Sequence, residues 1–214
     1  MQLDRDGAQH FAAAFTAAET AALAARFEHQ GANARLGRDE ALAVLIEPAS
    51  ALARRLLGAA ARPVRALFFD KTPERNWALG WHQDRTIAVR HRGETPGFTA
   101  WTLKSGIAHV VPPFDYLERM LTLRIHLDPA GPDNAPLLVA PGSHRLGRVA
   151  EPDIPAAVER LGSRLCLAQA GDVWAYSTPI LHASARSLKP ARRRVLQLSY
   201  SADTLPNGLE WLGV

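Results

Sequence analysis

A histidine and an aspartate stand two residues apart in Trp81-His82-Gln83-Asp84, and this pair most constrains how the chain can fold. Side chains at this spacing leave the same face of a β-strand. Such a pair can occupy two corners of one metal coordination face. A second histidine from a distant strand would complete the 2-His-1-carboxylate set that holds non-heme Fe(II) and leaves positions open for other ligands. The motif therefore predicts a strand that meets a distant segment around a metal.

The segment from Thr178 to Ser184 offers the missing histidine at His182. Arg193 follows eleven residues later, in a run that alternates as a strand does. A lone His-x-Asp pair often arises by chance, whereas the ordered set that ends in a histidine and an arginine is much more specific. A 2-oxo acid can chelate such a metal and leave one position for O₂. Its far carboxylate then needs a fixed cation, and the planar guanidinium of Arg193 suits a carboxylate.

His126-Leu127-Asp128 is a second His-x-Asp pair and stays open as an alternative metal site, although Asp128 begins a turn rich in Pro and Gly. His144 lies in a turn and is expected to be structural, while surface and substrate roles remain equally open for His91 and His109. The Arg192–Arg194 run would also suit a charged edge strand, which guards against edge pairing. Solvated positions are expected for Lys71, Lys104, Arg85 and Arg145.

With 214 residues, the chain has the length of one domain that can bury a core. Its net charge is +4 and its arginines are spread along the sequence, which does not favour nucleic-acid binding. The single cysteine, Cys166, excludes an intramolecular disulfide and fits a reducing compartment. The N-terminus has acids where a signal peptide has bases, and no apolar run approaches the roughly 20 residues of a membrane span. We therefore expect a cytoplasmic protein without membrane contact.

The order of the expected elements indicates a fold class. A short strand at 8–15 precedes a helix that begins with a Thr16–Glu19 capping box and runs to about Gln30. A loop at 32–38 leads to a second helix from about Pro48 to Leu57. Strands are then expected at 64–69, 77–84, 121–127, from 137, at 164–168, 173–176 and 193–200, with a loop rich in Pro and Arg before residue 164. Helices followed by many short strands predict a closed or sandwiched β core with helices outside it.

Residues 121–127 alternate cleanly between an apolar and a polar face. We expect a central strand whose apolar face, formed by Leu121, Leu123, Ile125 and Leu127, packs under the helices. Its polar face, formed by Thr122, Arg124 and His126, would line the active-site cavity. A buried Arg124 needs an anionic partner, either the co-substrate or an acidic group on the prime substrate.

With these pieces placed, the chain resembles the phytanoyl-CoA dioxygenase family of Fe(II)/2-oxoglutarate-dependent oxygenases. The likeness rests, in order, on Trp81-His82-Gln83-Asp84, Asn134-Ala135-Pro136-Leu137, Pro141-Gly142-Ser143-His144, Gly171-Asp172, His182-Ala183-Ser184 and Arg193. It implies a mainly β fold with flanking α-helices, the double-stranded β-helix (jelly roll, cupin-like). It also implies one domain over residues 1–214, with a mostly helical buttress at 1–62, a β-helix core at 63–205 and a substrate lid insertion at 85–118.

The resemblance also implies a ligand set. His82, Asp84 and His182 would bind Fe²⁺, and Arg193 with the Ser184 hydroxyl would bind the distal carboxylate of 2-oxoglutarate. We count Arg124 and Thr122 with the cofactor-binding residues. Two positions depart from the family pattern, because many members have Gly where this chain has Ala135 and Trp where it has Arg124.

These features favour an oxygenase that hydroxylates a small organic metabolite, with release of succinate and CO₂. Its partners would be O₂ and a small-molecule substrate, with an anionic group as one option. A catalytically silent cupin-like metal-binding or sensor protein is the alternative, and hydrolysis with zinc or another metal is a third possibility. The intact ligands and Arg193 favour turnover, since an inactive descendant has no need to keep all four. The substrate and the oligomeric state stay open.

Overall fold

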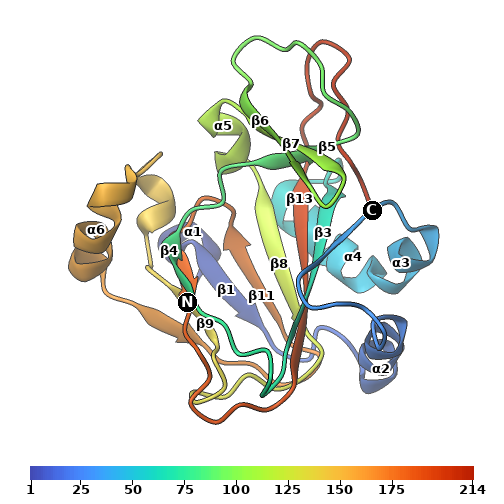
Figure 1. The fold of residues 1–214 in the computed structure, drawn as a ribbon, viewed down its shortest axis with the longest axis vertical. Coiled ribbons are helices and arrows are strands. Elements are labelled where there is room, and N and C mark those ends of the chain that lie inside the picture. Colours follow the sequence, from blue (N-terminus) through green and yellow to red (C-terminus); the bar gives the residue numbers. More distant parts are fainter.

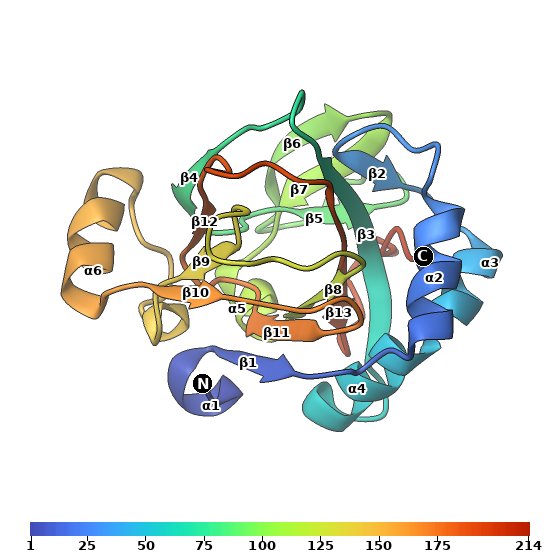
Figure 2. The same ribbon diagram turned by 90° about the horizontal axis from the view of Figure 1, so that it is seen from below.

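The computed structural model describes residues 1–214, whose strands form three antiparallel sheets. The large sheet runs in the order β1 (Ala8–Phe11), β11 (Val173–Ser177), β8 (Leu121–His126), β13 (Arg193–Ser201), β3 (Arg62–Lys71) and β2 (Ala34–Leu36). A four-stranded sheet has the order β10 (Arg164–Cys166), β9 (Leu137–Val139), β12 (His182–Ser184) and β4 (Leu79–His82). Figure 2 shows these two sheets facing each other as the walls of a roll. The expected mainly β, jelly-roll fold is confirmed.

Helices cover the outer faces of both walls. The helices are α1 (Leu3–Asp6), α2 (Ala17–Arg26), α3 (Glu40–Leu45), α4 (Glu47–Leu57), α5 (Phe114–Glu118) and α6 (Ile154–Leu161), with short 3-10 turns at Ser143–Arg145 and Glu151–Asp153. In Figures 1 and 2, α2, α3 and α4 lie outside the large sheet, and α6 lies outside the four-stranded one. None of these helices has both the length and the apolar character needed to cross a bilayer.

The expected helix signals are present at both long helices. Thr16 accepts from the backbone N–H of Glu19, whose carboxylate accepts from the Thr16 backbone N–H, so the predicted capping box is confirmed. This helix, α2, ends at Arg26, earlier than expected. The second predicted helix is confirmed as α4, with Pro48 in its first turn.

Strand β8 has the central place that its alternation predicts, between β11 and β13. Its apolar side chains belong to the main core, where they pack with α2, α3 and α4. Its polar side chains therefore point to the other face of the sheet, toward the interior of the roll. Strand β13 repeats this division, since Leu196, Leu198 and Tyr200 lie in the same core while Arg193 and Gln197 face inward.

Several segments differ from the expectation, among them the strands expected at 8–15 and 77–84, which are shorter, and helices α1 and α3, which were not expected. Residues 85–118 are not loop-rich: they form a third sheet of β5 (Ile87–Val89), β7 (Ile107–Val111) and β6 (Thr99–Lys104), and also α5. This sheet has an apolar core of its own that includes Trp211, which supports its short strands. Residues 34–36 pair with β3, so the 32–38 segment is not simply a loop, and residues 1–62 contribute β1 and β2 to the large sheet. The segment before residue 164 contains α6, where Pro155 occupies the first turn.

The packing of β8 gives a stability prediction. Leu123 is fully buried beneath the helices, and Leu123→Ala should lower the free energy of unfolding by about 2–5 kcal/mol. Leu103, on β6, is 73% exposed and offers the same substitution without a cavity. Leu103→Ala should change stability by no more than about 0.5 kcal/mol. Urea denaturation followed by circular dichroism measures both, and equal losses would contradict the packing described here.

Candidate metal centre and active-site cavity

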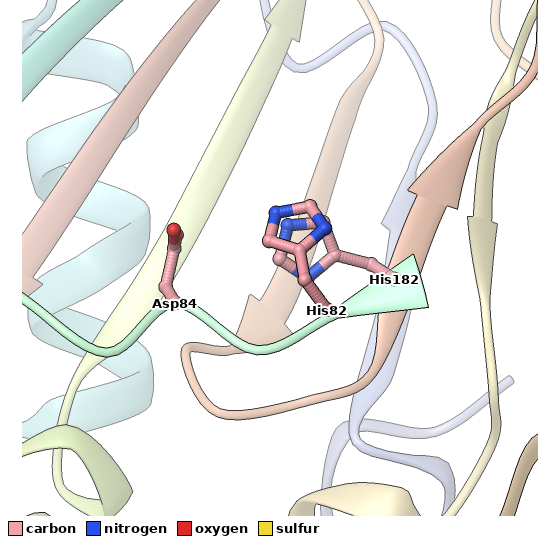
Figure 3. Close-up of side chains that lie close together, drawn as sticks. All are labelled: His82, Asp84 and His182. Carbon is pink, nitrogen blue, oxygen red and sulfur yellow. The ribbon is translucent and has the colours of Figure 1, made fainter. Parts of the chain in front are cut away.

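The His82, Asp84 and His182 side chains converge at one end of the four-stranded sheet. His82 ends β4 and His182 begins β12, whereas Asp84 lies in the loop after β4, so the strand expected at 77–84 ends before the carboxylate. The antiparallel register places His182 directly opposite His82, with ring centroids 4.2 Å apart. One potential ligand atom from each of the three residues lies within 4.8 Å of the others (Figure 3). The folded chain thus brings together the three predicted ligands from two distant segments.

Hydrogen bonds orient both imidazole rings for metal binding. Nδ1 of His82 lies 2.8 Å from the carbonyl oxygen of Gly80, and Nδ1 of His182 lies 3.0 Å from that of Ile180. Because a carbonyl oxygen only accepts, the proton of each neutral ring resides on Nδ1. The lone pair is then on Nε2, which is the arrangement of a metal ligand held by a backbone carbonyl.

The charges at this centre also suit a cation. Burial and the neighbouring His82 lower the pKa of His182 to about 4, so this ring is neutral near pH 7. Burial by itself would raise the pKa of Asp84, but Arg65 and the two histidines hold that pKa below its ordinary value. Asp84 Oδ2 is buried without a hydrogen-bond partner. An ionised carboxylate oxygen in this state calls for a cation, so the donor set fits a divalent metal ion.

The three residues open into a cavity of about 540 Å³, within the range of small-ligand sites. Its apolar lining comes from Leu67, Phe69, Trp77, Leu79, Leu137 and Ala183. Six cationic side chains also line it, namely Arg35, Arg65, Lys71, Lys104, Arg124 and Arg193, whereas Asp84 is the only acid. Such a cavity attracts anions.

Arg193 lies inside this cavity and is only 2% exposed. Its Nε and Nη1 atoms are buried and have no hydrogen-bond partner. Burial and the nearby Arg124 lower the pKa of its guanidinium. A buried guanidinium with two unused donors is suited to a carboxylate ligand.

Lys71 pairs with Arg193 across β3 and β13 and joins it in the cavity. Its ammonium donates to the carbonyl oxygens of Trp77 at 2.7 Å and Ala185 at 3.0 Å, and to Ser184 Oγ at 3.1 Å. Burial, Arg193 and Arg124 lower the pKa of Lys71 to about 7. The expectation of a solvated Lys71 is wrong, because its side chain is only 3% exposed. Lys71 can be recognised as a cavity residue only from the register of β3 against β13, which places it opposite Arg193.

Arg124 reaches the cavity as expected, and its immediate partners are neutral. Its Nη1 donates to Gln197 Oε1 at 2.8 Å, and its guanidinium lies 5.3 Å from the centre of the Phe69 ring. Its Nε is buried without a partner. The side chain is therefore held in place with donor capacity left over.

The other two polar residues of β8 are not in the cavity lining. The Thr122 hydroxyl is fully buried and shares a 3.0 Å hydrogen bond with Thr178, so it differs from the cofactor-binding position expected for it. His126 is fully buried, and burial lowers its pKa to about 3. Asp128 accepts a 2.8 Å hydrogen bond from Arg194. The second His-x-Asp pair, His126 and Asp128, is therefore not assembled as a metal site.

The remaining candidates divide between the cavity and the surface. Lys104 and His109 line the cavity, and His109 Nδ1 bonds to the carbonyl oxygen of Ile107 in the pattern of the two metal-site histidines. His91, His144, Arg85 and Arg145 lie outside it. Arg85 instead donates to the backbone oxygen of Val149, and Arg145 to that of Arg5 in α1.

Comparison with known families agrees with this geometry. The family model described as phytanoyl-CoA dioxygenase (PhyH) matches residues 3–195. The chain belongs to this family. The resemblance drawn from the sequence is therefore confirmed, and PhyH enzymes use Fe(II) and 2-oxoglutarate. The chain is thus an Fe(II)/2-oxoglutarate-dependent oxygenase by family.

Three solved structures illustrate the shared fold. EctD from S. alaskensis, in its apoform, is 21% identical, with a TM-score of 0.67 over 93% of this chain and 74% of EctD. HygX from Streptomyces hygroscopicus, with nickel and 2-oxoglutarate bound, is 16% identical, with a TM-score of 0.63 over 93% of this chain and 83% of HygX. The epimerase SnoN, in complex with Fe³⁺, alpha ketoglutarate and nogalamycin RO, is 17% identical, with a TM-score of 0.63 over 96% of this chain and 88% of SnoN. No curated protein matched the chain.

Ala135 shows why a departure from the PhyH pattern matters locally. Its φ angle is 49°, in the left-handed region that favours glycine, which many members have at this position. Its carbonyl oxygen accepts from Ser184 Oγ at 3.3 Å. The strained turn thereby supports a residue that lines the cavity.

The metal centre gives a binding prediction. Alanine at His82, Asp84 or His182 should reduce Fe(II) binding below detection under anaerobic calorimetry, because two remaining donors bind weakly. The far-ultraviolet circular dichroism spectrum should persist, since none of the three belongs to the apolar core.

His91→Ala removes an exposed histidine outside the cavity and serves as the matched control, which should bind one equivalent as the unchanged protein does. Loss of binding in His126→Ala with retention in His82→Ala would move the metal to the other His-x-Asp pair.

Proposed function

We propose that this protein hydroxylates a small organic molecule and converts 2-oxoglutarate to succinate and CO₂ as it does so. One observation carries this proposal. The three-donor centre and the unpaired Arg193 guanidinium share one cavity between the two sheets of the roll. A 2-oxo acid has a chelating end and a distal carboxylate, and these two features suit its two ends.

In this proposal, His82, Asp84 and His182 hold Fe(II). The bound metal supplies the reduction of O₂ that is coupled to oxidative decarboxylation of 2-oxoglutarate. The protein's contribution is to fix the donors: the Gly80 and Ile180 carbonyls set the two ring orientations, and Arg65 keeps Asp84 ionised.

Arg193 binds the distal carboxylate in this proposal, and the Lys71 ammonium, whose three donors are used by the protein, adds its positive charge beside it. Both are buried, and they are cross-strand neighbours on the inner face of the large sheet. Lys71 also contacts Ser184 Oγ, which places the Ser184 hydroxyl beside the same group. A carboxylate among these donors satisfies the unpaired guanidinium nitrogens and offsets the repulsion between the two cations.

Arg124 contributes a further positive charge at this end of the cavity. It lines the same cavity as Lys71 and Arg193 and lowers the pKa of both. Gln197 and Phe69 hold its guanidinium from the protein side. We assign it to 2-oxoglutarate as an electrostatic partner. Thr122 has no part in this assignment, because its hydroxyl is bonded to Thr178.

The cavity wall protects the reaction from water. Leu137 and Ala183 lie on the four-stranded sheet and Leu67 and Phe69 on the large sheet, so apolar side chains face the centre from both walls. Exclusion of water strengthens the charge interactions within the cavity. Hydroxylation is the proposed outcome, in a fold that also supports an epimerase, SnoN.

Turnover is the direct test of this function. The Fe(II)-loaded protein with 2-oxoglutarate and O₂ should form succinate, measured by chromatography, even without a prime substrate. Arg193→Ala should weaken 2-oxoglutarate binding about 30- to 1000-fold, because a desolvated charge pair loses one partner, while Fe(II) binding survives.

Arg192→Ala is the matched control, since Arg192 is the neighbouring residue and pairs with Asp70 and Glu28 outside the cavity. It should keep the affinity for 2-oxoglutarate. Normal binding in Arg193→Ala would contradict the assignment of Arg193. Fe(II) and 2-oxoglutarate binding without any succinate would instead favour a silent metal-binding protein.

The lowered pKa of Lys71 predicts a pH dependence. Free Lys71 loses its proton as the pH rises through about 7, whereas a bound carboxylate favours the protonated form. Binding of 2-oxoglutarate must then take up a proton above pH 7, and its affinity should fall, approaching about tenfold per pH unit. Calorimetry between pH 6.5 and 8.5 measures this slope. Lys71→Met should bind more weakly and lose most of the slope, and an unchanged slope in this variant would exclude Lys71 as its source.

A further inference from the structure

A second group of cations lies at the mouth of the same cavity. Arg35 on β2, Arg65 on β3 and Lys104 at the end of β6 line it, with His109 on β7 beside them. Arg35 is exposed and Lys104 is half-buried, which places this group at the solvent side. In Figure 2, β2, the upper part of β3 and the third sheet gather at this end of the roll.

These side chains lie close enough to affect one another. After burial, Arg35 and Arg65 are the main causes that lower the pKa of Lys104. Arg65, Lys104 and Arg35 also add to the effect of burial in lowering the pKa of His109. The mouth therefore concentrates positive charge and costs electrostatic free energy when it is empty.

The protein supplies almost no negative charge to balance this group. Neither Arg35 nor Lys104 forms an ion pair. Arg65 reaches Asp84 only at 3.9 Å, and its Nε is buried without a partner. By contrast, several arginines elsewhere are paired closely, as Arg194 is with Asp128 at 2.8 Å.

Iron and 2-oxoglutarate do not supply the missing charge either. Two positive charges from Fe(II), one negative charge from Asp84 and two from 2-oxoglutarate leave a single net negative charge. Lys71, Arg124 and Arg193 already surround the proposed 2-oxoglutarate site, and their combined positive charge is larger than this single negative charge. The cations at the mouth are therefore in surplus in the loaded enzyme as well.

We propose that the prime substrate is a small organic anion, whose carboxylate, phosphate or sulfate group binds Arg35, Arg65 and Lys104. This inference rests on the proposed oxygenase function and names the substrate class of that site. Arg65 contacts both regions, since it lies beside Asp84 and within the mouth group. An anion held there extends the rest of its molecule toward the metal centre. His109 donates through Nδ1 to the Ile107 carbonyl oxygen, so its Nε2 can only accept a hydrogen bond, from a donor group elsewhere on the substrate.

Binding of simple anions tests the proposal without knowledge of the substrate. Methyl phosphate, methyl sulfate and acetate are titrated by calorimetry into the anaerobic Fe(II)-loaded protein at saturating 2-oxoglutarate, which keeps Arg193 occupied. At least one should bind saturably, and neutral trimethyl phosphate should not. The three anions rank the headgroup chemistries against one another.

Charge-reversed variants locate the site. Lys104→Glu and Arg35→Glu should each weaken the anion about tenfold and leave 2-oxoglutarate affinity unchanged. Arg55→Glu makes the same change at an exposed position on α4 and should bind the anion normally. Absence of saturable binding, equal binding of trimethyl phosphate, or equal affinity in Lys104→Glu and Arg55→Glu would each overturn the proposal.

The test separates this inference from the function on which it rests. Failure of the unchanged protein to bind 2-oxoglutarate would overturn the proposed oxygenase. The difference in anion affinity between Lys104→Glu and Arg55→Glu would still show whether the cations at the mouth bind an anion. Succinate formation provides a second measurement, with small acids and their methyl esters as matched pairs. Stimulation by an acid and not by its ester supports an anionic substrate, and stimulation by esters as strong as that by acids overturns it.

Discussion

The antiparallel pairing of β13 with β3 and β8 determines which side chains enter the cavity. Its register sets Arg193 opposite Lys71 and places Gln197 beside Arg124, while Leu196 and Leu198 face the helices. A shift of one residue would exchange these two faces, bury charge against the helices and turn leucines toward the metal. The apolar core under α2, α3 and α4 thus fixes the position of the charged groups on the opposite face. The alternation of side chains along β8 and β13 therefore determines both the stability of the roll and the residues of the site.

The cavity stores electrostatic repulsion that the core must offset. Lys71, Arg124 and Arg193 are buried near one another, and the pKa shifts of Lys71 and Arg193 record the cost. Apolar residues in these places would be less costly for the fold. The presence of three cations there therefore points to ligands that bring negative charge. Any anion that binds there gains from relief of this repulsion, and it stabilises the folded protein to an extent set by its affinity and concentration. Folding and ligand binding are therefore coupled through charge at this end of the roll.

Sequence patterns predicted those parts of the molecule that depend on local periodicity. The faces of β8 and β13 and the Thr16 cap follow from spacing along the chain, and the motifs in their order named His82, Asp84 and His182, which the pairing of β4 with β12 then brings together. Lys71 and Arg65 could not be identified in this way, because their roles depend on which residues of β13 and of the metal loop lie opposite them. Strand β2 and the third sheet were missed because strands of three to six residues among Gly and Pro carry little periodic signal. Alternation assigned Thr122 to the inner face, but it does not tell how far along the strand the cavity extends.

The location of each group suggests how one fold separates shared chemistry from substrate choice. The metal donors belong to the four-stranded sheet and its loop, and the inner cations belong to β3, β8 and β13 of the large sheet. The cations at the mouth come instead from β2, from one position of β3 and from the third sheet, which has its own small core. Replacing a side chain at the mouth need not disturb the apolar core under α2, α3 and α4 or the ring orientations at the metal. Arg65 is the exception, since it lies beside Asp84 as well. A change at Arg65 would act on substrate and metal together, whereas Arg35 and Lys104 can vary with the substrate alone.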